Sequence, residues 1–315
     1  MQFFPDRDSF SKAYARGENQ VVYARLVADL DTPVSLMLKL AGARKNSFML
    51  ESVTGGEIRG RYSVVGMKPD IIWDCHGTRA RINRHARFDD NGFVDDDRDP
   101  LTSLRSLIEE SRIELPSDLP AIGAGLFGYL GYDMIRLVEH LPDVNPDPLG
   151  LADAMFLRPT ITIVLDGVKG EVTVISPVWH RADMNAAAAY AQAAERVADA
   201  IGDLDRSPPM ETRELAPDAA KAAPLSNTSK DEYLAMVEKA RGYIKAGDIF
   251  QVVPSRRFTL PCPSPLAAYK ELKQSNPSPY MFYMQDELFT LFGASPESAL
   301  KYETETNQIE IYPIA

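Results

Sequence analysis

The sequence contains few metal-binding or redox-active side chains. Its 315 residues include two cysteines, Cys75 and Cys262, and four histidines. The cysteines lie far apart and neither belongs to a C-x-x-C pair, so we expect neither a disulfide framework nor a zinc site. No apolar run approaches the roughly 18 residues of a membrane helix, and the first residues lack the pattern of a signal peptide. We therefore predict a cytoplasmic chain with two reduced thiols.

Positively charged residues are also fewer than negatively charged ones. The sequence has 34 lysines and arginines against 45 aspartates and glutamates, which gives a formal net charge of −11. A protein that binds the phosphate backbone needs a basic face to release counterions, and adsorption to anionic lipid is equally disfavoured. We expect neither nucleic acid nor a membrane among the partners.

Length and apolar content are sufficient for a large core. The hydrophobic share is 45%, and at about 150 residues per domain the length suggests two domains or one large one. Residues 204–226 mix four prolines with charges and show no periodicity, which is typical of a linker. The sequence therefore predicts an N-terminal domain at 1–203, a linker at 204–226 and a second domain at 227–315.

Capping residues indicate where helices begin and end. Thr32 and Asp99 each precede a proline at a first helical position, and Ser229 with Glu232 forms a capping box. Gly42 and Gly247 supply stops, and a third stop is expected at Gly202. Helices are predicted at 33–41, from 100 onward, at 183–201 and at 230–246.

Strand-like runs outnumber the helices and come in clusters. They are predicted at 48–53, 61–65, 70–75, 78–82, 121–130, 160–165, 172–176, 249–253, 280–284, 288–292 and 309–312. Strands and helices do not alternate strictly, and hairpins are frequent. The fold class is therefore α+β, with mainly antiparallel sheets and flanking helices.

Two motifs are similar to known ligand-binding motifs but lack the flanking structure or ligand spacing that such sites need. Gly123 to Gly128 matches G-x-G-x-x-G, yet a turn precedes it and no helix opens after it, so a dinucleotide site is rejected. The acidic stretch 89–97 lacks the ligand spacing of a calcium loop, and a solvated hairpin tip around Asn91 and Gly92 is expected instead.

A basic stretch follows the first strands. Its members are His76, Arg79, Arg81, Arg84, His85 and Arg87. They are interleaved with small or apolar residues, which is typical of a solvated strand face. Anion binding is the alternative.

Two further clusters have two interpretations each. Glu51 and Ser52 are adjacent in an apolar run, so alternation would bury one of them, and a buried carboxylate needs a partner; otherwise the run is an edge strand with Glu51 in water. The segment Asn276–Met281 carries two prolines, Tyr280 and Met281. It either forms a rigid turn that presents an aromatic and a thioether to a flat apolar ligand, or packs into the core.

Several motifs together resemble the chorismate-utilising enzymes. Residues 231–258, Gly293-Ala294-Ser295-Pro296-Glu297 and Pro313-Ile314-Ala315 are similar to the chorismate-binding domain. Upstream, residues 31–35, 50–52, 61–63 and 128–133 resemble the N-terminal region of anthranilate synthase component I. The resemblance implies an N-terminal domain followed by the start of a chorismate-binding domain, incomplete at residue 315.

Ala315 separates two members of this family. The aminodeoxychorismate synthases, the alternative within the family, characteristically carry a nucleophilic lysine after the Pro-Ile dipeptide, whereas anthranilate synthases carry alanine. A methyl group cannot attack a ring carbon, so ammonia must be the nucleophile. The resemblance thus favours an enzyme that converts chorismate and ammonia to anthranilate and pyruvate in tryptophan biosynthesis.

The resemblance also implies cofactors, partners and sites. A glutamine amidotransferase would deliver the ammonia, Mg²⁺ would bind the substrate in the complete enzyme, and L-tryptophan would inhibit it. In the family the chorismate, metal and acid–base residues follow Pro-Ile-Ala, so catalytic and metal residues are expected beyond Ala315 and this chain alone is expected to be inactive. A tryptophan-binding regulatory role alone is the other alternative. The expected L-tryptophan site comprises Glu51, Ser52, Asn276, Pro279, Tyr280 and Met281.

Overall fold

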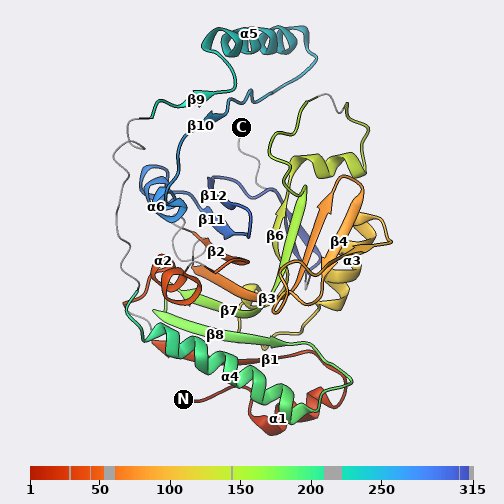
Figure 1. The fold of residues 1–315 in the computed structure, drawn as a ribbon, viewed down its shortest axis with the longest axis vertical. Coiled ribbons are helices and arrows are strands. Elements are labelled where there is room, and N and C mark those ends of the chain that lie inside the picture. The colour runs from red at the N-terminus through yellow and green to blue at the C-terminus, as the bar shows by residue number, and fades with distance from the viewer. Residues whose placement is uncertain are drawn as a thin grey trace. The chain divides into compact units, whose positions relative to one another are not determined.

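The computed structural model forms two compact units (Figure 1). The larger consists of Met1–Pro209 together with Tyr269–Ala315, and the smaller of Met210–Ala268. The predicted domain boundaries at 203 and 227 are boundaries along the sequence and stay a prediction. The structure describes residues 1–27, 30–42, 44–52, 61–142, 145–208, 222–304 and 306–311.

A ten-stranded antiparallel sheet organises the larger unit. Its main path runs β1-β8-β7-β3-β2-β11-β12, while β4 pairs with β3, β5 with β4, and β6 with β7. This architecture agrees with the predicted α+β class. The strands are β1 Gln20–Val27, β2 Ser47–Glu51, β3 Tyr62–His76, β4 Arg79–Asn83, β5 Phe93–Asp96, β6 Phe127–Leu130, β7 Ala154–Asp166, β8 Glu171–Val178, β11 Tyr280–Gln285 and β12 Thr290–Ser295.

The sheet divides into two branches along the long paired strands β3 and β7. The first half of β3 pairs with β2 and its second half pairs with β4. The register between β3 and β7 shifts between Pro69 and Ile71. The prediction of two separate strands at 61–65 and 70–75 was therefore wrong, because β3 continues through a bulge next to Pro69. Phe48 on β2 stacks on Phe127 on β6 at 4.5 Å between ring centroids, so the branches pack against each other.

Helices cover one end of the sheet. α1 (Arg7–Tyr14) and α4 (Ala186–Leu204) lie side by side over β1 and β8 (Figure 1). Gly202 does not end α4, which continues to Leu204, so that predicted stop was wrong. α3 (Pro100–Glu110) starts at its Asp99 cap, as predicted. The remaining helical segments of this unit are α2 Pro33–Leu36, η1 Met37–Ala41, η2 Ala121–Gly123 and η3 Tyr132–Leu137.

Gly128 shows why the glycine-rich motif is structural. A Cβ on Gly128 would lie 1.8 Å from the carbonyl oxygen of Met155 on β7. The glycine therefore permits close strand pairing, and β6, rather than a helix, contains it. The predicted strand at 121–130 was wrong in its first part, since Ala121–Gly123 is a 3₁₀ turn.

The smaller unit is built around α5 (Lys230–Ala246). Ser229 and Glu232 form the expected capping box, and Gly247 ends the helix at a φ of 84°. A short hairpin joins β9 (Leu225–Ser226) to β10 (Phe258–Thr259). The strand predicted at 249–253 does not form, because no neighbouring segment within the described part of this unit pairs with it.

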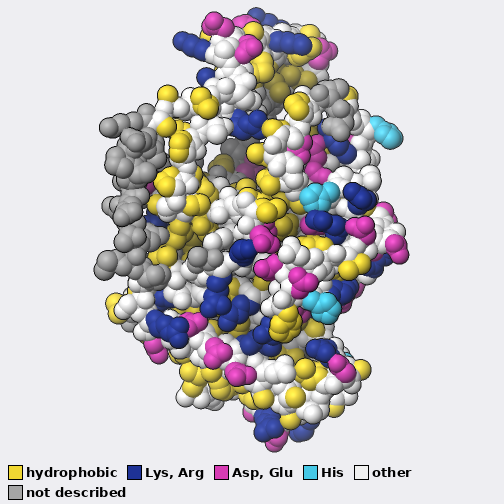
Figure 2. Space-filling model, viewed as in Figure 1, with side chains coloured by type: hydrophobic (Ala, Val, Ile, Leu, Met, Phe, Trp, Pro, Cys, Tyr) yellow, Lys and Arg dark blue, Asp and Glu magenta, His cyan; other side chains and the backbone are white. Residues whose placement is uncertain are grey.

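The remaining elements complete the chain. α6 (Pro265–Ser275) begins in the smaller unit and ends in the larger one, and β13 (Lys301–Glu303) pairs with β14 (Gln308–Glu310). The strand predicted at 309–312 begins within β14, while residue 312 lies outside the described residues. Within the described ranges, none of the helices has the length and apolarity needed to cross a membrane. Figure 2 shows acidic and basic side chains interspersed over the visible face.

Candidate functional site

Strand pairing brings the two sequence clusters together. β2 pairs with β11 in the antiparallel sense, with Glu51 opposite Met281 and Leu50 opposite Phe282. Segments about 230 positions apart in the sequence therefore become neighbours inside the larger unit. Because β2 also pairs with β3, it is an internal strand, and Glu51 is only 5% exposed. The edge-strand alternative for Glu51 is thus wrong.

The buried Glu51 carboxylate has two partners on α6. The Tyr269 hydroxyl donates to Oε1, and the Lys273 ammonium lies 2.5 Å from Oε2. Tyr269 and Lys273 are four residues apart, so both project from one face of the helix. Burial, and then the bond to Glu51, raises the pKa of the Tyr269 hydroxyl. Two charge-assisted bonds therefore offset the cost of burying this carboxylate.

The expected ligand residues lie on or beside these paired strands. Ser52 follows Glu51 and is half-buried, and Pro279 is half-buried at the start of β11. Side chains alternate along the strand, so Tyr280 is 43% exposed whereas Met281 is 1% exposed. Asn276 is exposed just beyond the end of α6. The structure thus pairs Glu51 with Met281, with Ser52, Pro279 and Tyr280 next to this pair along the chain, whereas Asn276 lies four residues before Tyr280.

The sequence reasoning missed Tyr269 and Lys273. No helix was predicted at 265–275, although Pro265 at a first helical position and the spacing of Leu266, Tyr269 and Leu272 carry that signal. Tyr269 also contacts Tyr283 of β11 edge-on, with 5.6 Å between the ring centroids. α6 therefore forms one wall of the junction.

The fit of a magnesium ion can be tested on the side chains present. Among the described residues, no group of three or more histidine, cysteine, aspartate or glutamate side chains could hold a metal ion. The described side chains therefore do not fit Mg²⁺.

Comparison with known families identifies the family of this chain. Residues 48–315, which include every expected ligand residue, match the model of the family described as chorismate binding enzyme. The chain belongs to the chorismate-binding enzyme family. The predicted family resemblance is thereby confirmed.

Two relatives of this chorismate-binding chain carry the same name. This chain is 60% identical over 312 residues to anthranilate synthase component 1 of Cereibacter sphaeroides, and the match covers 98% of this chain and 61% of that protein. It is 34% identical over 317 residues to the protein of the same name from Pseudomonas putida, covering 98% and 62%. The chain thus spans about three fifths of the length of these relatives.

A solved structure supports the fold. The crystal structure of anthranilate synthase component I from Streptococcus pneumoniae TIGR4 superposes with a TM-score of 0.63 at 26% identity. The match covers 80% of this chain and 54% of that one. The predicted α+β class is therefore confirmed for this chorismate-binding chain.

Proposed function

We propose that this chorismate-binding chain belongs to the large subunit of a cytoplasmic anthranilate synthase. The complete protein would convert chorismate and ammonia to anthranilate and pyruvate, with ammonia delivered by a partner glutamine amidotransferase. The identity of 60% to a component 1 protein over 98% of the chain supports this proposal, and the name component 1 implies a second component. The activity is assigned to the complete protein, because the chain spans 61% of that relative.

The proposed role of the described residues is regulatory. L-tryptophan would bind at the β2–β11 junction and inhibit the complete enzyme. The observation that carries this proposal is the register that sets Glu51 opposite Met281. It brings a polar segment and an aromatic–thioether segment together, and such pockets combine apolar walls with few polar groups.

Exposure suggests how the ligand would be held. The indole would pack against the exposed ring of Tyr280, with Pro279 beside it and the buried Met281 as the floor. Ser52 would hydrogen-bond the ligand, and Asn276 would contribute at the rim. Glu51 already pairs with Lys273, so its proposed role is to hold α6 in place, and the ligand ammonium would have to share its carboxylate.

Calorimetry with L-tryptophan tests the regulatory proposal. The complete protein is expected to bind one equivalent, and D-tryptophan is the matched control because it has the same indole with inverted ammonium and carboxylate positions. Absence of stereoselective binding would contradict the proposed site.

A second assay tests the chemistry. The complete protein, supplied with chorismate, Mg²⁺ and ammonium, is expected to form fluorescent anthranilate, and the 315-residue chain is expected to form none above the blank. Aminodeoxychorismate from the complete protein would contradict the proposed reaction. Anthranilate from the 315-residue chain would contradict its proposed inactivity.

A further inference from the structure

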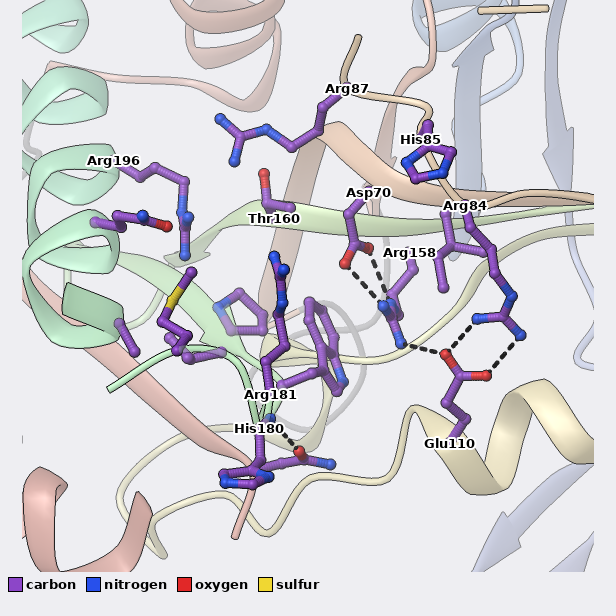
Figure 3. Close-up of a pocket in the computed structure, with 18 of the residues that line it drawn as sticks. Asp70, Arg84, His85, Arg87, Glu110, Arg158, Thr160, His180, Arg181 and Arg196 are labelled. Atoms are coloured by element: carbon purple, nitrogen blue, oxygen red, sulfur yellow. Dashed lines mark hydrogen bonds and ion pairs between the residues drawn. The ribbon is translucent and has the colours of Figure 1, made fainter. Parts of the chain in front are cut away.

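A cavity of the larger unit, lined by none of the β2 or β11 residues, has an excess of positive side chains. It has a volume of about 590 Å³ and is bordered by the β4–β5 loop, the middle of β7, the segment after β8, and α4 (Figure 3). Among its lining side chains, five arginines against two acids leave a formal charge of +3, in a chain whose net charge is −11. The arginines are Arg84, Arg87, Arg158, Arg181 and Arg196, and the acids are Asp70 and Glu110.

The two acids are already engaged at one wall. Buried Arg158 forms a two-bond pair with Asp70 at 2.9 and 2.7 Å, and Arg84 forms one with Glu110 at 2.7 and 2.8 Å (Figure 3). Both carboxylates are therefore already paired with arginines, and Glu110 also lies 3.5 Å from Arg158. Arg181 pairs with Asp183, outside the cavity lining.

Arg87 and Arg196 form no direct ion pair with the described residues, although Asp70 and Glu195 act on Arg196 from a greater distance. Among the described residues, no carboxylate lies within ion-pair distance of either one, and Arg196 donates only to the hydroxyl of Ser176 at 2.9 Å. Burial, and then the proximity of Arg87, lowers the pKa of Arg196 to about 10. The burial of the Arg196 charge and its repulsion by Arg87 are unfavourable, and a bound anion would offset both.

The wall also contains an unpaired donor. The Trp179 Nε1 atom is buried and has no acceptor among the described residues, and the Arg158 guanidinium lies over the Trp179 ring at 4.1 Å. A buried N–H without an acceptor is unfavourable by about 1–3 kcal/mol. An uncompensated donor therefore belongs to a residue that lines the same cavity as these cations.

We propose that this cavity binds a small-molecule anion that carries at least two negative charges, such as a phosphate ester or a polycarboxylate. Guanidinium groups match the planar oxygen pairs of phosphate and carboxylate. The volume lies in the range of about 300–1,000 Å³ that is typical of small-molecule sites and far exceeds a single chloride ion. None of the residues that line this cavity belongs to the expected L-tryptophan site.

Titration at constant ionic strength tests the proposal. The 315-residue chain is titrated with inorganic phosphate and, separately, with citrate, while calorimetry and tryptophan fluorescence are recorded; acetate is the monovalent control. We expect saturable binding of one equivalent of phosphate, citrate or both, and the two arms distinguish phosphate from polycarboxylate chemistry. Failure of both to saturate, or equal binding of acetate, would overturn the proposal.

Fluorescence can locate the bound anion because the chain has two tryptophans. Trp73 is fully buried and donates to Ser103 at 2.9 Å, whereas Trp179 lines the cavity. Replacement Trp179→Phe is expected to remove the fluorescence change, whereas calorimetry should still detect saturable binding with an affinity no higher than that of the parent. A fluorescence change that persists in Trp179→Phe would place the anion elsewhere and contradict the assignment.

A matched pair of charge variants gives the decisive comparison. Arg196→Gln is expected to weaken binding about tenfold or more, because it removes a charged hydrogen-bond donor. Arg206→Gln, just beyond the same helix and 76% exposed, removes the same charge and is expected to bind as the parent does. Without anion, Arg196→Gln should unfold no earlier than the parent, and added anion should raise the Tm of the parent more.

If Arg196→Gln fails to fold, Arg87→Gln provides the same test. Arg87 is exposed, and its replacement removes one positive charge from the other side of the cavity. Parent-like affinity in the folded variants would overturn the proposal.

Discussion

The Lys273 ammonium lies 2.5 Å from the Glu51 carboxylate and joins α6 to β2 across 222 positions of the sequence. The carboxylate is buried, whereas the lysine side chain is 27% exposed. Loss of the carboxylate charge would therefore leave an ammonium that water can partly solvate. The loss of stability should be moderate and measurable.

We expect Glu51→Gln to lower the free energy of unfolding by about 1–3 kcal/mol, since a charged hydrogen bond is lost and the Tyr269 hydroxyl keeps an amide acceptor. Urea denaturation followed by circular dichroism measures the change. Glu18→Gln, which removes an exposed partner of Arg16, is the control and should leave the midpoint unchanged. Equal effects of the two variants would show that the buried pair stabilises the protein no more than the exposed pair does.

Ser52→Ala tests the contribution of the Ser52 hydroxyl to the proposed tryptophan site. If Ser52 hydrogen-bonds the ligand, the alanine variant of the complete protein should bind L-tryptophan roughly three- to tenfold more weakly. Calorimetry measures the affinity. The control is Ser117→Ala, an exposed serine in the turn before η2. An unchanged Kd for Ser52→Ala would remove Ser52 from the proposed site.

The two thiols should differ greatly in reactivity. Cys75 is fully buried on β3, whereas Cys262 is exposed. Burial, and then the negative charges of Asp153 and Asp74, raises the pKa of the Cys75 thiol to about 11. A disulfide reagent at pH 8 should titrate one thiol rapidly and the second only after denaturation, and Cys262→Ser should remove the fast phase. Two fast thiols in the folded protein would contradict this assignment.

Cys75 also predicts a loss of stability in alkali. Between about pH 9, where the unfolded thiol ionises, and about pH 11, the native state retains a proton that the unfolded state has lost. The free energy of unfolding should therefore fall as the pH rises through this window, by at most about 1.4 kcal/mol per pH unit from this group. Cys75→Ala should show a shallower slope in urea denaturation at successive pH values. An identical slope would mean that other groups account for the loss.

Two glycine-to-alanine changes should have opposite effects. Gly128→Ala drives a Cβ into the Met155 carbonyl and is expected to destabilise the protein by at least about 1–3 kcal/mol. Gly202 lies inside α4 with open space around its Cβ position, so Gly202→Ala should stabilise the helix by about 0.5–1 kcal/mol. Thermal unfolding measures both. A stable Gly128→Ala protein would contradict the tight pairing of β6 with β7.

Local signals predicted the elements that local contacts determine. The caps at Asp99, Ser229 and Gly247 placed the ends of α3 and α5, because capping depends on residues three or four positions apart. Apolar runs were less informative. Residues 249–253 have the composition of a strand, yet a strand forms only where a partner is available, and composition does not reveal one.

The long-range contacts of the candidate site could not be predicted from any local sequence pattern. The sequence showed that a buried Glu51 would require a partner, but it could not indicate Lys273 across 222 positions. Only the family resemblance linked Glu51 and Ser52 with Tyr280 and Met281. The arginine cavity illustrates the same limit. Arg84 and Arg87 belong to the basic stretch in the sequence, whereas Arg158, Arg181 and Arg196 reach the cavity only through the pairing of β7 with β8 and the packing of α4.

The pairing of β2 with β11 also sets an order of events on the ribosome. β2 is synthesised early, but its second neighbour arrives about 230 residues later, a delay of roughly 10–50 seconds at ordinary elongation rates. During that interval the edge of β2 that will receive β11 is unpaired and open to association with another chain. Codon usage and chaperone access over residues 52–280 should therefore influence the yield of folded protein more than changes within either strand's own coding segment.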